Sequence, residues 1–149
     1  MKKFFFKLES VLKYKNDKLN ILRNEHAKIL QRLASQEEKI AGLEKSRDAF
    51  AAEFDKKKMG GIASMEAVNY QNYLTRQSVV IKREYDVLRA IHQEEEQKKN
   101  EILEMRKESV AIEKLKEINL EQYRKEESKE HEQFIEEFVS NSKVAERSR

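Results

Sequence analysis

Hydrophobic residues recur every seven positions through the N-terminal part of the chain, in two rows offset by three. The first row is Phe5, Leu12, Leu19, His26, Leu33, Ile40, Arg47 and Phe54, and the second is Leu8, Lys15, Leu22, Ile29, Gln36, Leu43 and Phe50. Eleven of these 15 positions are apolar, a proportion typical of a coiled-coil helix. We therefore predict a helix over residues 4–58.

A Gly-Gly pair separates this segment from a second one with the same periodicity. Lysines at 56–58 suit a helix C-terminus, Gly60 and Gly61 suit the residues after it, and Ser64 can cap the next helix. The expected seam positions of this second segment are Tyr70, Leu74, Gln77, Ile81, Glu84, Leu88, Ile91, Glu95, Lys98, Ile102, Met105, Ser109 and Ile112. This pattern predicts a turn over 59–64, a helix over 65–140 and a frayed tail over 141–149, all in a single coiled-coil domain.

The two helices are expected to fold back on each other about Ile62, so that residue i faces residue 124 − i. The apolar layers are then Phe54 with Tyr70, Phe50 with Leu74, Leu43 with Ile81, Leu33 with Ile91, Leu22 with Ile102, Leu19 with Met105, and Leu12 with Ile112. The polar layers are Arg47 with Gln77, His26 with Lys98, and Lys15 with Ser109. Such isolated polar layers fix the register of a coiled coil. Glu84 and Glu95 would face Ile40 and Ile29, with their charges reaching water.

The predicted fold class is therefore all-α, a long two-helix antiparallel coiled-coil hairpin. In this register the first helix has no residues left to pair beyond about residue 120. The second helix continues for about 20 residues, or ~30 Å at 1.5 Å per residue. Residues 121–139 contain seven acidic and three basic side chains and also Phe134, Ile135, Phe138 and Val139. A partner is expected to cover these apolar side chains, although a solvated overhang remains the alternative.

Composition narrows the possible functions. Charged residues make up 40% of the chain, both signs are interspersed, and the net charge is only +3, which is typical of solvated helix faces. The chain has no cysteine, its three histidines are widely separated, and it lacks a glycine-rich phosphate loop. We therefore predict no catalytic residues, no metal, no cofactor and no small-molecule ligand. No apolar run is long enough to span a membrane.

Three short motifs resemble a known family. They are the opening Phe4-x-Phe6-x-Leu8-Glu9-x-Val11-Leu12-x-Tyr14-Lys15, the turn Gly61-Ile62-Ala63-Ser64 followed by Asn69-Tyr70-Gln71-x-Tyr73, and the later Glu113-Lys114-Leu115-Lys116 with Tyr123. Together they resemble the bacterial flagellar FliJ family over nearly the whole chain. The resemblance implies a non-catalytic, cytoplasmic subunit of the flagellar type III export apparatus, similar to the central stalk of rotary ATPases and peripherally associated with the inner membrane at the flagellar base.

The resemblance also implies three partners: the hexameric flagellar export ATPase, the cytoplasmic domain of the large export-gate membrane protein, and export chaperones. By the family's pattern, Tyr73, Gln77 and Val80 map onto the gate-binding surface, and Tyr73, Val80 and Val87 recur every seven residues. The glutamine departs from a purely apolar docking face, and all four side chains could instead simply shield the core. Candidates for binding the ATPase ring are Phe4, Phe6, Leu8, Leu120, Tyr123, Phe134, Ile135 and Phe138.

Two other functions are compatible with the same pattern. The chain could be a generic coiled-coil scaffold that dimerises through its overhang, whereas an export stalk is expected to be monomeric when alone. It could also bind nucleic acid or a membrane surface through Lys2, Lys3, Lys7, Lys13, Lys15 and the lysines at 56–58. Acidic residues interrupt most of these basic stretches, so we expect no nucleic-acid partner.

Overall fold

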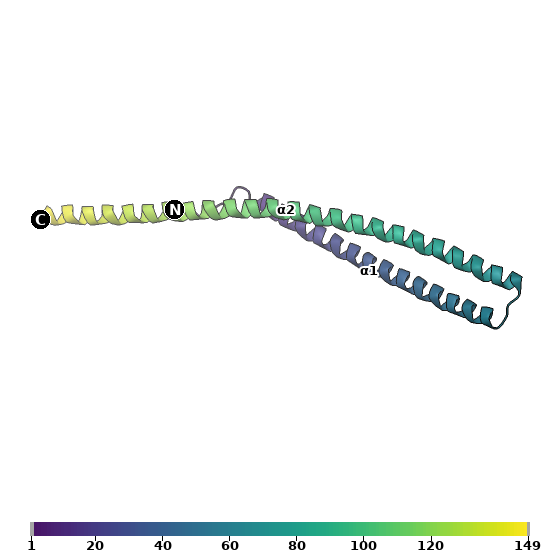
Figure 1. Ribbon diagram of the computed structural model, residues 1–149. Helices are drawn as coiled ribbons and strands as arrows, with labels where there is room; N and C mark the ends of the chain where they lie inside the picture. Colours follow the sequence, from purple (N-terminus) through teal and green to yellow (C-terminus); the bar gives the residue numbers. More distant parts are fainter. Residues whose placement is uncertain (1, 149) are drawn as a thin grey trace. The chain divides into compact units, whose positions relative to one another are not determined.

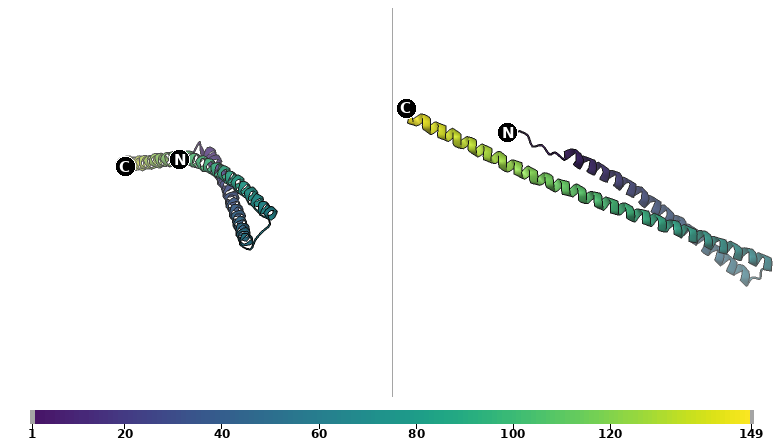
Figure 2. Two further views of the ribbon diagram at one scale, coloured as in Figure 1. Left: turned by 45° about the vertical axis from the view of Figure 1, so that its right-hand side comes forward. Right: turned by 90° about the horizontal axis from the view of Figure 1, so that it is seen from above.

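The computed structural model describes residues 2–148, and the regular secondary structure in this range consists of two helices. Helix α1 spans Glu9–Met59, helix α2 spans Ser64–Arg147, and a short turn lets α2 return alongside α1 (Figures 1 and 2). The chain is an all-α helical hairpin, which confirms the predicted fold class. Its contacts form two units: a turn unit, Asn20–Leu103, and a terminal unit, residues 2–19 and 104–148.

The turn unit is held together by one apolar seam between the two helices. Its buried side chains come from both helices: Leu22, Ile29, Ile40 and Phe54 from α1, and Ile81 and Ile91 from α2. The rings of Phe54 and Tyr70 stack with centroids 5.0 Å apart. This is the layer that the predicted register requires, and the ion pair between Lys98 and Glu25, at 2.8 Å, agrees with it. The predicted register is therefore confirmed at these two levels of the unit.

Aromatic rings are concentrated at the end of the seam next to the turn. Phe50 lies 4.9 Å from the Tyr70 ring and 4.2 Å from the Tyr73 ring, measured between centroids. The Lys58 ammonium lies 3.9 Å from the centre of the Phe54 ring, within range of a cation–π contact. These contacts tie the last turns of α1 to the first turns of α2.

The terminal unit continues the same register with smaller apolar layers. Leu12 and Leu19 are buried, and Ser109 is only 4% exposed. The Ser109 hydroxyl donates a hydrogen bond to Asn16 Oδ1 over 2.5 Å. Lys15, which was expected to face Ser109, instead pairs with Glu108, and Lys116 pairs with Glu9, each at 2.8 Å. Polar contacts thus align the two helices where hydrophobic burial is weakest.

The N-terminal end departs from the prediction, because α1 begins at Glu9 rather than near residue 4. Phe5, the expected first seam residue, is 80% exposed, whereas Phe6 is 5% exposed. In an extended segment successive side chains point to opposite sides, so Phe4 and Phe6 face the hairpin while Phe5 faces away. The first helical hydrogen bond of α1 joins the Leu12 amide to the Leu8 carbonyl, and the heptad pattern is valid only from there.

The C-terminal end also differs, because α2 continues to Arg147 instead of ending near residue 140. The predicted frayed tail is therefore helical up to that residue, while Arg149 lies outside the described residues. Apart from Val144, residues 141–147 are polar or small, and they include neither glycine nor proline. Without one of these helix-breaking residues, the backbone continues its own hydrogen bonding.

The turn depends on one glycine conformation. Gly61 has φ of +86°, a region that L side chains rarely adopt, whereas Gly60 does not have positive φ. Ser64, expected as a cap before the second helix, is instead its first residue. The Ala63 carbonyl accepts the helical hydrogen bond from the Ala67 amide over 3.0 Å. The positive φ of Gly61 thus allows the backbone to change direction between the two helices.

Replacing Gly61 with alanine is expected to destabilise the protein by about 1–2 kcal/mol, because an L residue is strained at this φ. Gly60→Ala is the matched control: its added Cβ would meet nothing closer than 3.8 Å, so its effect should be small. Urea denaturation followed by circular dichroism measures both. Equal effects of the two substitutions would contradict the role given to Gly61.

Candidate protein-binding surfaces

The predicted gate-binding residues lie on α2 in the turn unit, and they differ in how exposed their side chains are. Tyr73 packs against the Phe50 ring and is half-buried, and Gln77 is half-buried as well. Val80 and Val87 are 37% and 45% exposed. Only these two valines keep apolar surface that is largely available to a partner, so they are the centre of this candidate surface.

The packing of Tyr73 was missed by the sequence pattern. The pattern paired Phe50 with Leu74, but the Phe50 ring lies against Tyr70 and Tyr73. Tyr73 flanks the seam by one position, and a tyrosine is long enough to reach across from there. The large size of Phe50 and Tyr73 was the one feature of the sequence that could have indicated this contact.

The predicted ring-binding residues also separate into two groups. Phe4, Phe6, Leu8, Leu120 and Tyr123 pack within the terminal unit and are buried or half-buried. The Phe4 ring lies 5.5 Å from the Tyr123 ring, and the Tyr123 hydroxyl donates a hydrogen bond to the Lys2 carbonyl over 2.5 Å. These residues fasten the N-terminal segment to α2 and leave little apolar area for another protein.

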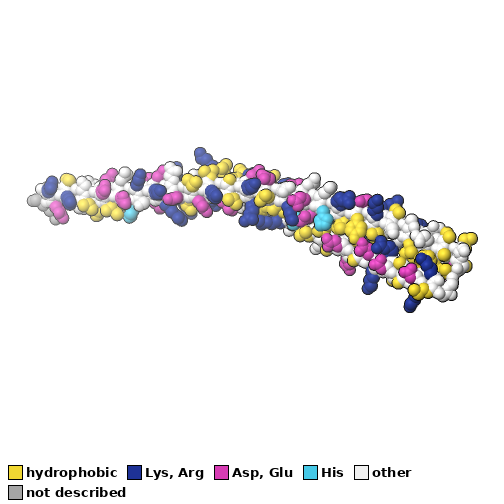
Figure 3. All heavy atoms as spheres, in the orientation of Figure 1, with side chains coloured by type: hydrophobic (Ala, Val, Ile, Leu, Met, Phe, Trp, Pro, Cys, Tyr) yellow, Lys and Arg dark blue, Asp and Glu magenta, His cyan; other side chains and the backbone are white. Residues whose placement is uncertain are grey.

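The second group lies on the part of α2 beyond Tyr123, which we call the overhang, residues 124–147. Phe134, Ile135 and Phe138 are 67%, 47% and 66% exposed, and Val139 is 44% exposed. Spacings of three and four residues bring these side chains to one face of the helix. Figure 3 shows yellow side chains along one edge of this stretch, among dark blue and magenta ones. The overhang is thus an amphipathic helix without an intrachain cover.

A buried carboxylate lies in the middle of the turn-unit seam. Glu95 is 8% exposed, and its Oε1 lies 3.1 Å from His26 Nε2 and 3.2 Å from Lys99 Nζ. The expectation that its charge would reach water is wrong, because Glu95 is buried and its carboxylate is paired with the half-buried His26 and the exposed Lys99. The expected layer of His26 with Lys98 is replaced by His26 with Glu95. The hydrogen bond to His26 and, after it, contact with Lys99 hold the pKa of Glu95 below its usual value.

Glu84 forms a second polar layer in the same unit. Its Oε2 accepts a hydrogen bond from Gln36 over 2.5 Å, and its Oε1 pairs with Lys39 at 3.1 Å. The hydrogen bond from Gln36, followed by that from Lys39, lowers the pKa of Glu84. Both glutamate carboxylates therefore form charge-assisted hydrogen bonds with side chains of α1. These bonds help to fix the register of the two helices at two separate levels.

The acidic and histidine side chains are spread along the two helices. Within residues 2–148, no group of three or more His, Asp or Glu side chains is arranged to hold a metal ion. In the same range neither helix has a stretch long and apolar enough to cross a membrane. The surfaces that the structure offers are exposed helix faces, which suit recognition of other proteins.

Comparison with known proteins agrees with the motifs. The family model described as "Flagellar FliJ protein" matches residues 4–147. No match was found among curated proteins or among solved structures. The family match covers both units and both candidate surfaces.

The contacts of Glu95 with His26 and Lys99 predict a dependence of stability on acid pH. Folding lowers its pKa, so Glu95 stabilises the folded state above its ordinary pKa of 4.5, and this contribution is lost as pH falls through the folded value. Glu95→Gln should therefore lose less unfolding free energy than the wild type between pH 6 and pH 3. Urea denaturation at several pH values measures this.

Glu96→Gln is the matched control, because it removes the same charge from the exposed neighbouring position. If both variants respond to acid in the same way, the pH dependence does not come from the buried carboxylate.

Proposed function

Because the chain belongs to the flagellar FliJ family, whose members have a non-catalytic, export-related role, we propose that it is the central stalk of the flagellar export ATPase. In this role it binds the hexameric ATPase ring, promotes ring assembly and ATP hydrolysis, and links the ring to the export gate and to export chaperones. Association with the inner membrane at the flagellar base is then peripheral and follows from binding these partners.

The overhang is the observation that carries this proposal. Its apolar stripe, Phe134, Ile135, Phe138 and Val139, is exposed on a helix that has passed the end of α1. A stalk that enters a ring needs a single slender helix whose side chains can contact surrounding subunits. The overhang provides that helix, and the packing of Phe4 against Tyr123 secures its base.

The turn unit supplies a separate surface for the export gate. Val80 and Val87 lie seven residues apart on α2, next to the seam residues Ile81 and Leu88, so both are held on a rigid helix. Tyr73 and Gln77 border them but are half-buried, and they contribute less free contact area. The two surfaces lie in different units, which allows one chain to bind two partners.

Replacing Phe134 and Phe138 together by serine should weaken binding to the export ATPase by about tenfold or more, because aromatic anchors dominate protein interfaces. Both side chains are exposed, so the hairpin should keep its stability. The measurement is ATP hydrolysis by the cognate ATPase with increasing amounts of each variant, with ring assembly followed by light scattering. Wild-type protein should raise turnover and hexamer formation.

Ile21→Ser is the control, since Ile21 is 51% exposed on α1, away from the overhang. Failure of the wild-type protein to bind or stimulate the ATPase would refute the stalk function. Full stimulation by the Phe134 and Phe138 variant would instead remove the overhang from the interface.

Replacing Val80 and Val87 together by serine should weaken binding to the cytoplasmic domain of the export-gate protein by about tenfold, and should leave ATPase stimulation unchanged. The matched control is Val68→Ser with Val79→Ser, because these valines have similar exposure, 53% and 46%, on another side of α2. Calorimetric titration compares the two double variants. An equal loss of affinity in both would mean that the stripe is not a specific gate contact.

A further inference from the structure

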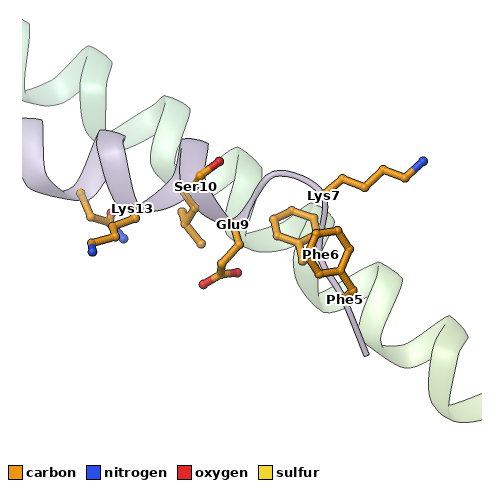
Figure 4. A pocket seen from close by; sticks show the side chains of 8 residues that line it. Phe5, Phe6, Lys7, Glu9, Ser10 and Lys13 are labelled. Atoms are coloured by element: carbon orange, nitrogen blue, oxygen red, sulfur yellow. The ribbon is translucent and has the colours of Figure 1, made fainter. Parts of the chain in front are cut away.

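A groove lies at the start of α1 in the terminal unit. Phe5, Phe6 and Leu12 form its apolar lining, together with Ser10 and Asn16 (Figure 4). Phe6 and Leu12 are buried, so they form the floor, whereas Phe5 is 80% exposed and stands at the edge. Phe5 and the apolar floor together form a surface on which the apolar stripe of another helix can pack.

The groove has a positive border. Lys7 and Lys13 line it, and neither forms an ion pair within residues 2–148. Figure 4 shows Lys7 extending outward, away from the two phenylalanine rings. The acidic lining residue, Glu9, is paired with Lys116 at 2.8 Å, so its charge is already compensated. The groove therefore favours an amphipathic helix that carries negative charge beside its apolar stripe.

The overhang has this composition. Its apolar stripe is bordered by Glu132 and Glu136, and the second of these lines a shallow surface hollow with Ile135, Val139, Ser140 and Lys143. The overhang, residues 124–147, contains seven acidic and five basic side chains, and six of the acidic ones precede Phe138. The chain thus carries both a basic apolar groove and an acidic apolar helix in its terminal unit.

The overhang of the same molecule cannot reach this groove. Glu9 pairs with Lys116 and Asn16 bonds to Ser109, so the groove lies level with residues 109–116 of α2. Residue 137, at the centre of the stripe, is more than 20 residues further along a continuous helix, or ~30–40 Å away. The overhang that fills the groove must therefore come from another molecule.

We propose that two copies of this chain associate in antiparallel fashion, the overhang of each docking in the groove of the other. Such a pair has two-fold symmetry, so the same contact forms twice. This pairing differs from the monomer that the resemblance to an export stalk implies for the free protein, an expectation that was formed without knowledge of the groove. If the overhang also enters the ATPase ring, as proposed above, pairing and ring binding compete for one surface.

A charge-swap experiment tests this pairing with full-length chains. One variant carries Lys7→Glu and Lys13→Glu, and the other carries Glu132→Lys and Glu136→Lys. Each alone should self-associate about tenfold more weakly than wild type, because like charges then meet at both contacts. An equimolar mixture should regain association, since every groove then meets an overhang of opposite charge. Sedimentation equilibrium over a range of concentrations measures all three.

The matched control is Lys28→Glu with Lys82→Glu, which makes the same charge change at exposed positions outside the terminal unit and should self-associate like wild type. Circular dichroism of each variant checks that the helices are intact. A monomeric wild type at all concentrations, or a mixture no more associated than its two components, would overturn the proposal.

Disulfide trapping supplies an independent readout, because the natural chain has no cysteine. A chain with Ser10→Cys in the groove, mixed with one carrying Ser140→Cys beside the stripe, should form mainly the mixed dimer on mild oxidation. Equal amounts of mixed and like dimers would argue against the antiparallel arrangement. Neither substitution touches a side chain that the ATPase proposal depends on, so failure here leaves that proposal standing.

Discussion

The register between the two helices is the constraint on which the other features depend. Each helix of a hairpin buries only one narrow stripe, so each buried residue needs a partner at a defined height on the other helix. The stacking of Phe54 on Tyr70 and the hydrogen bond between Ser109 and Asn16 follow the same pairing, one in each unit. Because α2 is longer than α1, this pairing leaves the overhang without a partner in its own chain. The exposed surfaces are thus a consequence of where the helices are aligned.

Hydrophobic contacts alone would not define that alignment well, because a seam of similar aliphatic residues can slip by one heptad at modest cost. The polar layers remove this freedom. Slipping would separate Glu95 from His26 and Glu84 from Gln36, leaving half-buried charges without hydrogen bonds. Replacing these groups by leucine could raise stability, yet it would also make alternative registers more nearly equal in energy. Their role is therefore specificity of pairing, obtained at some expense of apolar burial.

The heptad pattern was sufficient to predict the fold and most of the seam, because periodicity reports which face of a helix is buried. It failed where the backbone is not helical or where side-chain length matters. Phe5 fits the heptad but lies in an extended segment, so Phe6 is buried in its place. Tyr73 flanks the seam yet reaches Phe50, and Glu95 is paired with His26 instead of reaching water. The candidate sites were predicted as sets of residues; which members remain exposed could be learned only from the packing.

The difference between packed and exposed site residues determines which part of the terminal unit can bind a partner. Phe4, Phe6 and Tyr123 are occupied in holding the base of the overhang, while Phe134 and Phe138 remain exposed and carry the available apolar area. A pair of copies would cover that area in the free protein, and the concentrations and affinities of the competing partners would determine whether the pair persists. A ring that binds the overhang more tightly than a second copy does would separate the pair, whereas in its absence the stripe would stay covered. Self-association and stalk function are therefore compatible uses of one surface, ordered by their relative affinities.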